Sequence, residues 1–282
     1  MKRKLFPYAA AAVFLILAVA LTSLPAPAAS VKDLLAKIEK HYTDVKSVDY
    51  VYFTHGYDTF AGKTSQEMQE KEGQGGGKKS SGPPKFVDAT YNVKFMKPYV
   101  IQMTIVNGDF LPQMIWGGKF TYNPETGTKN WYAKLGGGPA MKRNVKNDEY
   151  IDMIIPMGWT MNLLNLKNHL ANGTAKLAGK QKIQGRDCNV IEISYTPDQW
   201  KNFKVLKIDF NNWGIPADVQ PSVYTSIKGA TEKKYSNVKF FVTVKDNFII
   251  QTEDYIDGKF FWRTEYRNVQ FNNLKKTDFN PK

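Results

Sequence analysis

The fold of this chain is decided by residues 91–106, which read YNVKFMKPYVIQMTIV. Bulky apolar residues alternate with polar residues on both sides of Lys97-Pro98. Successive side chains of a strand point to opposite faces of a sheet, so the alternation predicts two strands with one apolar face and one polar face. The predicted apolar face consists of Val93, Phe95, Ile101, Met103 and Ile105.

Similar strand patterns continue along the chain on both sides of this stretch. Turn signals separate them, including Asn107-Gly108, Gly117-Gly118 and Asp257-Gly258. We expect strands at residues 48–57, 86–96, 99–106, 113–116, 119–122, 128–134, 175–184, 188–195, 204–210, 238–245, 248–256 and 260–271. Residues 211–237, with their prolines and glycine, are expected to be irregular. The pattern predicts a meander of roughly ten strands in one domain.

Two helical segments are expected beside these strands. Ser30-Val31-Lys32-Asp33 resembles a capping box, and an apolar stripe at helical spacing follows it to about Lys46. Asn147 is expected to cap a second segment, which Pro156 and Gly158 divide into short helices at residues 148–157 and 159–169. This segment carries four flexible or apolar side chains, which suit either a repacking ligand surface or ordinary core filling: Met153, Ile154, Met157 and Met161.

The first 28 residues have the features of a secretory signal peptide. Lys2, Arg3 and Lys4 precede the apolar run 9–21, and Ala26-Pro27-Ala28 matches a small-x-small cleavage site. The alternative is a retained membrane anchor, but the apolar run is short for a spanning helix. We therefore predict a domain of residues 29–282 that is periplasmic or extracellular.

Charge and composition limit the classes of partner that we expect. The formal net charge is +13, and cleavage of the signal would lower it to +10 by removing three cations. Such a balance favours anionic partners such as a membrane surface, although solubility alone also explains it. No nucleic-acid recognition motif accompanies the charge, so nucleic acid is not expected as a partner. Residues 61–85, with six glycines and five lysines, predict a flexible loop.

Enzyme signatures are missing from the sequence. The three histidines, His41, His55 and His169, lack metal-type spacing. Cys188 lies in an apolar strand pattern and is expected to be an inert buried thiol. Glu253 and Asp254 are adjacent, so on a strand they face opposite ways and make a poor acid–base pair. We predict no catalytic residues, no metal and no cofactor.

Several short motifs resemble the periplasmic lipoprotein-carrier (LolA-like) family. They are the block from Val93 to Met103 around Lys97-Pro98, the turns Gly118-Lys119 and Asn123-Pro124, and the tail that ends in Asp278-Phe279 before Pro281. The resemblance implies an open antiparallel half-barrel with helices forming a lid over a hydrophobic cavity. In carriers of this family the residue before the proline is an arginine that ties the lid shut. Here it is Lys97, which lacks arginine's planar fork.

The resemblance also implies a function for the apolar face. The implied ligand is a lipid, or the acyl chains of a lipoprotein, held in a cavity lined by the apolar face and the second helical segment, with Lys97 as a lid contact or headgroup ligand. An envelope membrane protein is a further expected partner. From the residues alone, an ordinary core is the favoured explanation of the apolar face, since every sheet protein has such a face. The alternatives are an envelope sensor or regulator with the same fold, and a wall- or glycan-binding protein that uses aromatic side chains such as Trp116, Trp131, Trp200 and Trp213.

Overall fold

The computed structural model describes residues 30–57, 85–109, 113–124, 130–134, 139, 141–144, 157–211 and 213–279. These residues form one 11-stranded antiparallel sheet with the order β6-β5-β4-β3-β2-β1-β11-β10-β9-β8-β7. The strands are β1 (Ser47–Tyr57), β2 (Phe86–Met96), β3 (Val100–Gly108), β4 (Lys119–Tyr122), β5 (Asn130–Lys134), β6 (Met141–Asn144), β7 (Thr174–Ile183), β8 (Arg186–Ser194), β9 (Asn237–Thr243), β10 (Ile249–Ile256) and β11 (Lys259–Phe271).

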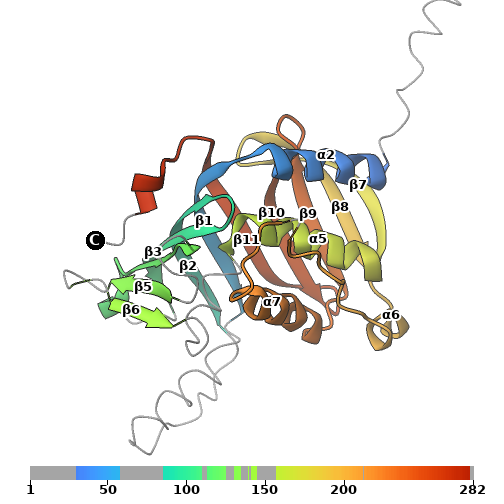
Figure 1. Cartoon of the computed structure of the whole chain (residues 1–282). Helices are drawn as coiled ribbons and strands as arrows, with labels where there is room; N and C mark the ends of the chain where they lie inside the picture. Colours follow the sequence, from blue (N-terminus) through green and yellow to red (C-terminus); the bar gives the residue numbers. More distant parts are fainter. Residues whose placement is uncertain are drawn as a thin grey trace, which may run out of the picture.

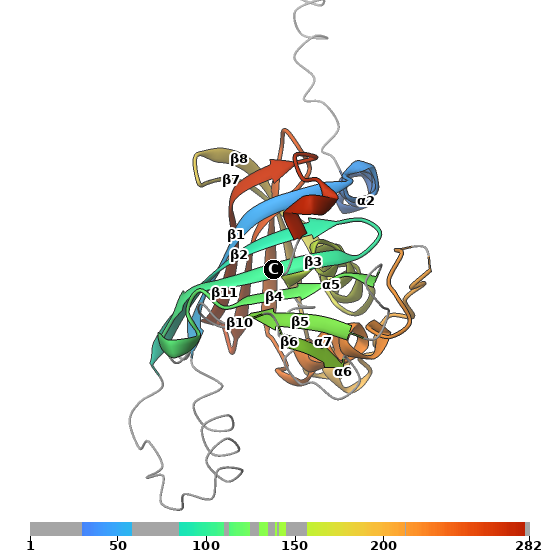
Figure 2. The ribbon, with the colours of Figure 1, turned by 60° about the vertical axis from the view of Figure 1, so that its left-hand side comes forward.

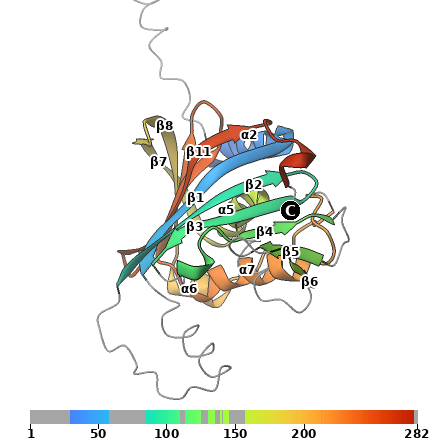
Figure 3. The ribbon, with the colours of Figure 1, turned by 90° about the vertical axis from the view of Figure 1, so that its left-hand side faces the viewer.

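The sheet curves around a layer of helices. The helices are α2 (Val31–Asp44), α5 (Trp159–Asn172), α6 (Pro197–Lys201) and α7 (Gln220–Glu232), with 3-10 turns η1 (Gln113–Ile115) and η5 (Lys276–Phe279). Helices α2, α5 and α7 lie side by side on the concave face, with α5 in the middle (Figures 1 and 3). In the described part of the chain the edge strands β6 and β7 do not pair, so the sheet is an open half-barrel (Figure 2). The predicted fold class is confirmed.

Helix α2 begins at the predicted capping box. The Ser30 hydroxyl accepts a hydrogen bond from the Asp33 N–H at 3.1 Å, and the Asp33 carboxylate accepts one from the Ser30 N–H at 3.2 Å. Aspartate therefore replaces the usual glutamate of this motif. Leu34, Ile38 and Tyr42 form the buried stripe, as the periodicity predicts. The helix ends at Asp44, two residues before the predicted end.

Helix α5 is buried nearly all round because it lies between two other helices and above the sheet. Trp159, Leu163 and Leu166 have no exposed area. The predicted helix 159–169 is therefore confirmed and extends to Asn172. The other predicted half, residues 148–156, lies outside the described residues, as do the signal peptide and most of the predicted loop 61–85.

The predicted strand at residues 204–210 is wrong, and the structure gives the reason. Asn172 at the end of α5 accepts from the Lys204 N–H and donates to its carbonyl, both at 2.9 Å. Asn168 accepts from the Leu206 N–H at 2.9 Å. These backbone groups are bonded to helix side chains, so they do not join a sheet. A segment of alternating polar and apolar residues can bond its backbone either to a neighbouring strand or to side chains of a helix.

Three further predictions need correction. Residues 211–237 are not irregular throughout, because α7 occupies Gln220–Glu232 with Pro221 in its first turn, where proline is well tolerated. The predicted strand 113–116 is the 3-10 turn η1. Strand β6 was missed because it is a four-residue edge strand that carries Lys142 and Arg143, and short charged edge strands lack an apolar pattern.

Candidate ligand-binding site

The apolar residues predicted to line a cavity share one face of β2 and β3. Val93 lies opposite Met103, and Phe95 lies opposite Ile101, in the β2–β3 register. All five predicted residues, including Ile105, are at most 1% exposed and belong to the main apolar cluster. The structure therefore brings these side chains together under the helices.

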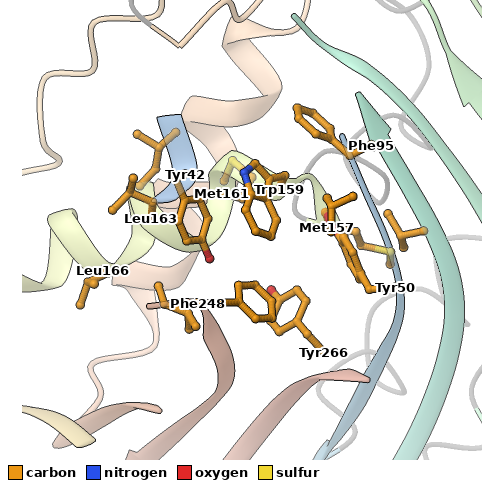
Figure 4. Close-up of a cluster of buried hydrophobic side chains, with 14 of the residues drawn as sticks. Tyr42, Tyr50, Phe95, Met157, Trp159, Met161, Leu163, Leu166, Phe248 and Tyr266 are labelled. Atoms are coloured by element: carbon orange, nitrogen blue, oxygen red, sulfur yellow. The ribbon is translucent and has the colours of Figure 1, made fainter. Parts of the chain in front are cut away.

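The methionines of the second helical segment lie nearby, where α5 begins. Met157 and Met161 are 7% and 1% exposed and belong to the same cluster as the sheet residues. Met153 and Ile154 lie outside the described residues. The part of the predicted site that the structure describes is thus one continuous apolar surface between α5 and the sheet (Figure 4).

Large aromatic side chains occupy the space between the helices and the sheet. Trp159 of α5 stacks on Tyr42 of α2 with ring centroids 4.3 Å apart, and on Phe248 with centroids 5.2 Å apart. Tyr50 and Tyr266 approach this group from β1 and β11 (Figure 4). The sequence contained no signal for this filling, because it depends on which rings meet. An acyl chain can occupy the concave face only if a helix moves away from it.

Helix α5 is held to the sheet by buried polar contacts. The Tyr50 hydroxyl donates to the Met157 carbonyl, and the Tyr266 hydroxyl donates to Asn162 at 2.6 Å. His169 Nδ1 lies 2.5 Å from the Tyr195 hydroxyl. Burial lowers the pKa of His169 to about 4, so the ring is neutral at pH 7. Breaking these contacts would leave buried polar groups without partners, which makes α5 a poor candidate for the mobile helix.

Helix α2 is held more lightly. It fully buries the Leu34, Ile38 and Tyr42 side chains, and Val31, Leu35 and His41 pack against the cluster while partly exposed. One ion pair joins it to α5, between Glu39 and Lys167 at 2.7 Å, and both side chains are about one-third exposed. Partly exposed pairs of this kind contribute little to stability. Among the described helices of the concave layer, α2 is therefore easier to displace than α5.

Lys97 fastens the end of α2 to the sheet. Its Nζ donates to the carbonyl oxygens of Tyr42 at 2.7 Å and of Thr43 at 2.5 Å. The last carbonyls of a helix have no intrahelical partner and form the negative end of its dipole, so a cation is favourable there. Partial burial lowers the pKa of Lys97, and Asp44 opposes this change. We call these two hydrogen bonds the Lys97 latch.

A hollow of about 770 Å³ opens at the rim of the sheet beside this latch. We call it the rim hollow. It is lined by Thr43, Lys46, Ser47, Met96, Lys97, Pro98, Asn211, Trp213, Gly214, Asn272 and Leu274. Sequence reasoning assigned a lipid contact only to Lys97 among these residues, although it named Trp213 for the glycan-binding alternative and Met96 and Pro98 as parts of a family motif. The others come from segments that are far apart in the chain, and no local pattern marks them as one site.

Other predicted features can be placed in the structure. Cys188 is buried, and burial raises the pKa of its thiol. Glu253 accepts from the Tyr255 hydroxyl at 2.7 Å, whereas Asp254 on the opposite face hydrogen-bonds Tyr235. Burial raises the pKa of Asp254 to about 7, with Lys233 opposing it, and sequence reasoning missed this environment. Among the described residues, no cluster of His, Cys, Asp or Glu is arranged to hold a metal ion.

Comparisons with known proteins concern the fold. No protein-family model and no curated protein matches the chain. It is similar to lipoprotein LppX of Mycobacterium tuberculosis, with 12% identity over 88% of this chain and 99% of that one and a TM-score of 0.41. It is also similar to LprF of Mycobacterium bovis, with 13% identity over 91% of this chain and 98% of that one and a TM-score of 0.41. A third similar structure is a LolA superfamily protein of Nitrosomonas europaea, with 9% identity over 90% of this chain and 98% of that one and a TM-score of 0.32.

The chain itself is an open antiparallel half-barrel with helices on its concave face. Identities this low describe the arrangement of elements and do not extend to function. Within the described ranges, no helix has both the length and the apolar character needed to cross a membrane.

Proposed function

We propose that this protein is an exported, non-catalytic binding protein that holds a lipid, or the acyl chains of a lipoprotein, against its concave face and carries it through the cell envelope. The observation that carries the proposal is the Lys97 latch, which fastens a lightly held helix against the Trp159 and Phe248 rings of the main apolar cluster. An ordinary core needs no such releasable cover. The ligand would contact the predicted residues Val93, Phe95, Ile101, Met103 and Ile105.

Loading requires α2 to move, because its Tyr42 stacks on Trp159 over the apolar face. Exposing its three buried side chains, Leu34, Ile38 and Tyr42, costs about 5–9 kcal/mol at roughly 1.5–3 kcal/mol each. Burying a 16-carbon acyl chain gains roughly 12 kcal/mol gross at about 0.8 kcal/mol per methylene. The gain exceeds this cost by roughly 3–7 kcal/mol, which is comparable only to the low end of the about 4–15 kcal/mol that association costs, so a long acyl chain or more than one chain is needed to open the layer.

The remaining parts of the proposal concern location and partners. The predicted signal peptide places the protein in the periplasm or outside the cell. Its positive charge favours transient contact with an anionic membrane surface, where lipid is collected or delivered. An envelope membrane protein is the further partner that such delivery would use. No cofactor is required, because carriage involves no chemical step.

The test is direct. The protein, expressed with its signal, is purified from the envelope fraction without detergent and extracted with organic solvent, and the extract is analysed by mass spectrometry. We expect co-purified acyl lipid, and we expect the lipid-stripped protein to bind a fluorescent 16-carbon fatty acid. Lys97→Met should load this probe faster than the parent, whereas Lys40→Met, on the exposed side of the same helix, should load at the parental rate. An empty extract together with no probe binding by any of the three proteins would refute the proposal.

A further inference from the structure

The rim hollow is built from four segments that are distant in the sequence. The link from α2 to β1 contributes Thr43, Lys46 and Ser47, and the β2–β3 turn contributes Met96, Lys97 and Pro98. The remaining walls are formed by Asn211, Trp213 and Gly214 and by the segment after β11 that contains Asn272 and Leu274. At about 770 Å³ the hollow has the size of a small-ligand site.

Hydrogen bonds and close packing hold these walls in place. Asn272 Oδ1 accepts from the Lys46 N–H at 2.7 Å, and the Lys97 N–H donates to the Lys46 carbonyl at 2.9 Å. Gly214 has φ +61°, and a Cβ at this position would lie 3.2 Å from the Cβ of Pro98. Gly214 therefore rests directly against Pro98 in the β2–β3 turn. The rim hollow is a formed site and not a gap between loosely placed loops.

The lining combines an apolar wall with positive charge. Met96, Pro98, Trp213 and Leu274 are apolar, whereas Lys46 and Lys97 are the charged residues among those that line it. No aspartate or glutamate belongs to the lining.

The neighbouring charged groups largely have partners of their own. The nearby Asp44 is exposed and bonded to Lys40 at 2.6 Å. Lys167 of α5, whose Nζ lies 6.0 Å from the Trp213 ring centroid, is paired with Glu39. Asp44 also acts electrostatically on Lys97, but this one carboxylate is shared with Lys40, so the two lining lysines keep a net positive charge at the hollow.

We propose that the rim hollow binds the anionic head and first methylenes of an amphiphile, with the head at Lys46 and Lys97 and the methylenes against Trp213 and Leu274. This inference rests on the proposed function, since it assigns the polar end of the ligand whose acyl chain the concave face would take. A carboxylate and a phosphate share the required chemistry, so a fatty acid and a phospholipid are both sources of such a head.

Occupation of the rim hollow has a consequence for α2. An ammonium group has three donors, and Lys97 uses two of them on the Tyr42 and Thr43 carbonyls. A carboxylate or phosphate is a stronger acceptor than a neutral carbonyl, so an anion in the hollow draws Lys97 away from the helix end. Binding of the head thereby weakens the latch at the moment when the acyl chain needs α2 to move.

The experiment uses short amphiphiles below their micelle concentrations: dodecyl phosphate, dodecanoate and the neutral dodecyl maltoside. Binding is followed by tryptophan fluorescence. The signal should change with both anionic probes, disappear in Trp213→Phe and persist in Trp116→Phe, whose exposed indole lies outside the hollow. The tighter of the two anionic probes identifies the source of the head. Lys46→Gln, a substitution of an exposed side chain, should weaken anion binding about tenfold, as expected for one lost charge-assisted contact.

The matched control is Lys180→Gln, on an exposed position of β7, which should bind like the parent. Hydrogen exchange of the α2 amides should accelerate with dodecyl phosphate and stay unchanged with dodecyl maltoside. Equal affinity for neutral and anionic probes, or parental affinity in Lys46→Gln, would overturn the assignment. Unchanged α2 exchange at saturation would overturn the coupling.

Failure of this inference and failure of the proposed function can be told apart. The fluorescent 16-carbon fatty acid shares the carboxylate that the rim hollow binds, so its additional affinity over dodecanoate reports on the concave face, and the short probes report on the rim hollow. Binding of the long probe without a Trp213 response to the short probes refutes the rim site alone. A charge-dependent Trp213 response, combined with an empty solvent extract and a long probe that binds no more tightly than dodecanoate, supports the rim site and refutes carriage of an acyl chain.

Discussion

Replacing Lys97 by methionine tests the contact on which the proposed opening depends. Methionine keeps an unbranched side chain of similar length but removes the ammonium group. The carbonyl oxygens of Tyr42 and Thr43, now 2.7 and 2.5 Å from Nζ, then lose their donor. The change leaves the apolar stripe of α2 intact, so its effect reports on the latch alone.

The expected loss of stability follows from these two hydrogen bonds. A hydrogen bond that involves a charged group contributes about 1.5–3 kcal/mol when it is shielded from water. Lys97 is only half-buried, so water replaces part of what is lost, and the two bonds together are worth about 1–3 kcal/mol. We expect the free energy of unfolding of Lys97→Met to fall by this amount, and the α2 amides to exchange faster than those of α5.

The measurement is urea unfolding at pH 7, followed by tryptophan fluorescence, with hydrogen exchange to localise the effect. Lys40→Met is the matched control, because Lys40 forms a highly exposed pair with Asp44 on the same helix and should contribute little. Lys97→Arg should retain most of the stability, because a guanidinium can also donate to both carbonyls. If Lys97→Met and Lys40→Met unfold at the same urea concentration and show equal α2 exchange, the latch reasoning is wrong.

Three other changes test separate parts of the structure. Buried His169 has a pKa of about 4 against an ordinary value near 6.5, so the stability it contributes is complete above pH 6.5 and is lost as the pH falls toward 4. The raised pKa of Asp254, about 7, changes stability with the opposite sign across this range, so the parent is compared with His169→Gln. The free energy of unfolding, measured with urea from pH 7 to 4, should fall less in His169→Gln than in the parent. Equal losses in the two proteins would contradict the prediction. Gly214→Ala should lower the melting temperature more than Gly258→Ala does. Both residues have positive φ, which strains an alanine by about 1–2 kcal/mol, but only at Gly214 would the added Cβ meet a neighbour, Pro98. Equal melting temperatures of the two variants would refute the contact. Asn172→Ala should speed proteolysis at residues 203–209, whose backbone it holds, and unchanged cleavage would show that other contacts hold the segment.

Local patterns predicted those elements whose side chains alternate or recur on one face. The β2–β3 pair was predicted from Val93, Phe95, Ile101 and Met103, because burial of one sheet face requires a period of two residues. Helix α2 was predicted because Ser30 and its apolar stripe are both local signals. In such cases the residues that form the pattern also form the structure, so no knowledge of distant segments is needed.

Errors arose where a distant partner decides between two locally acceptable structures. Residues 204–210 alternate as a strand does, but Asn168 and Asn172 of α5 bond their backbone. Helix α7 was missed because Pro221 is a helix breaker in general and is well tolerated only in the first helical turn. Sequence spacing does not reveal which of these situations applies.

The candidate site divides in the same way. Local sequence was sufficient to predict that one sheet face is apolar and that a cation precedes Pro98, because both are properties of neighbouring residues. Three features became visible only in the folded chain. Trp159 and Tyr42 fill the concave space, and Lys97 reaches the end of α2. Trp213 and Leu274 lie beside Lys97 in the rim hollow. The physical reason is that packing and hydrogen bonding depend on distances in space, and chain folding makes those distances independent of separation along the sequence.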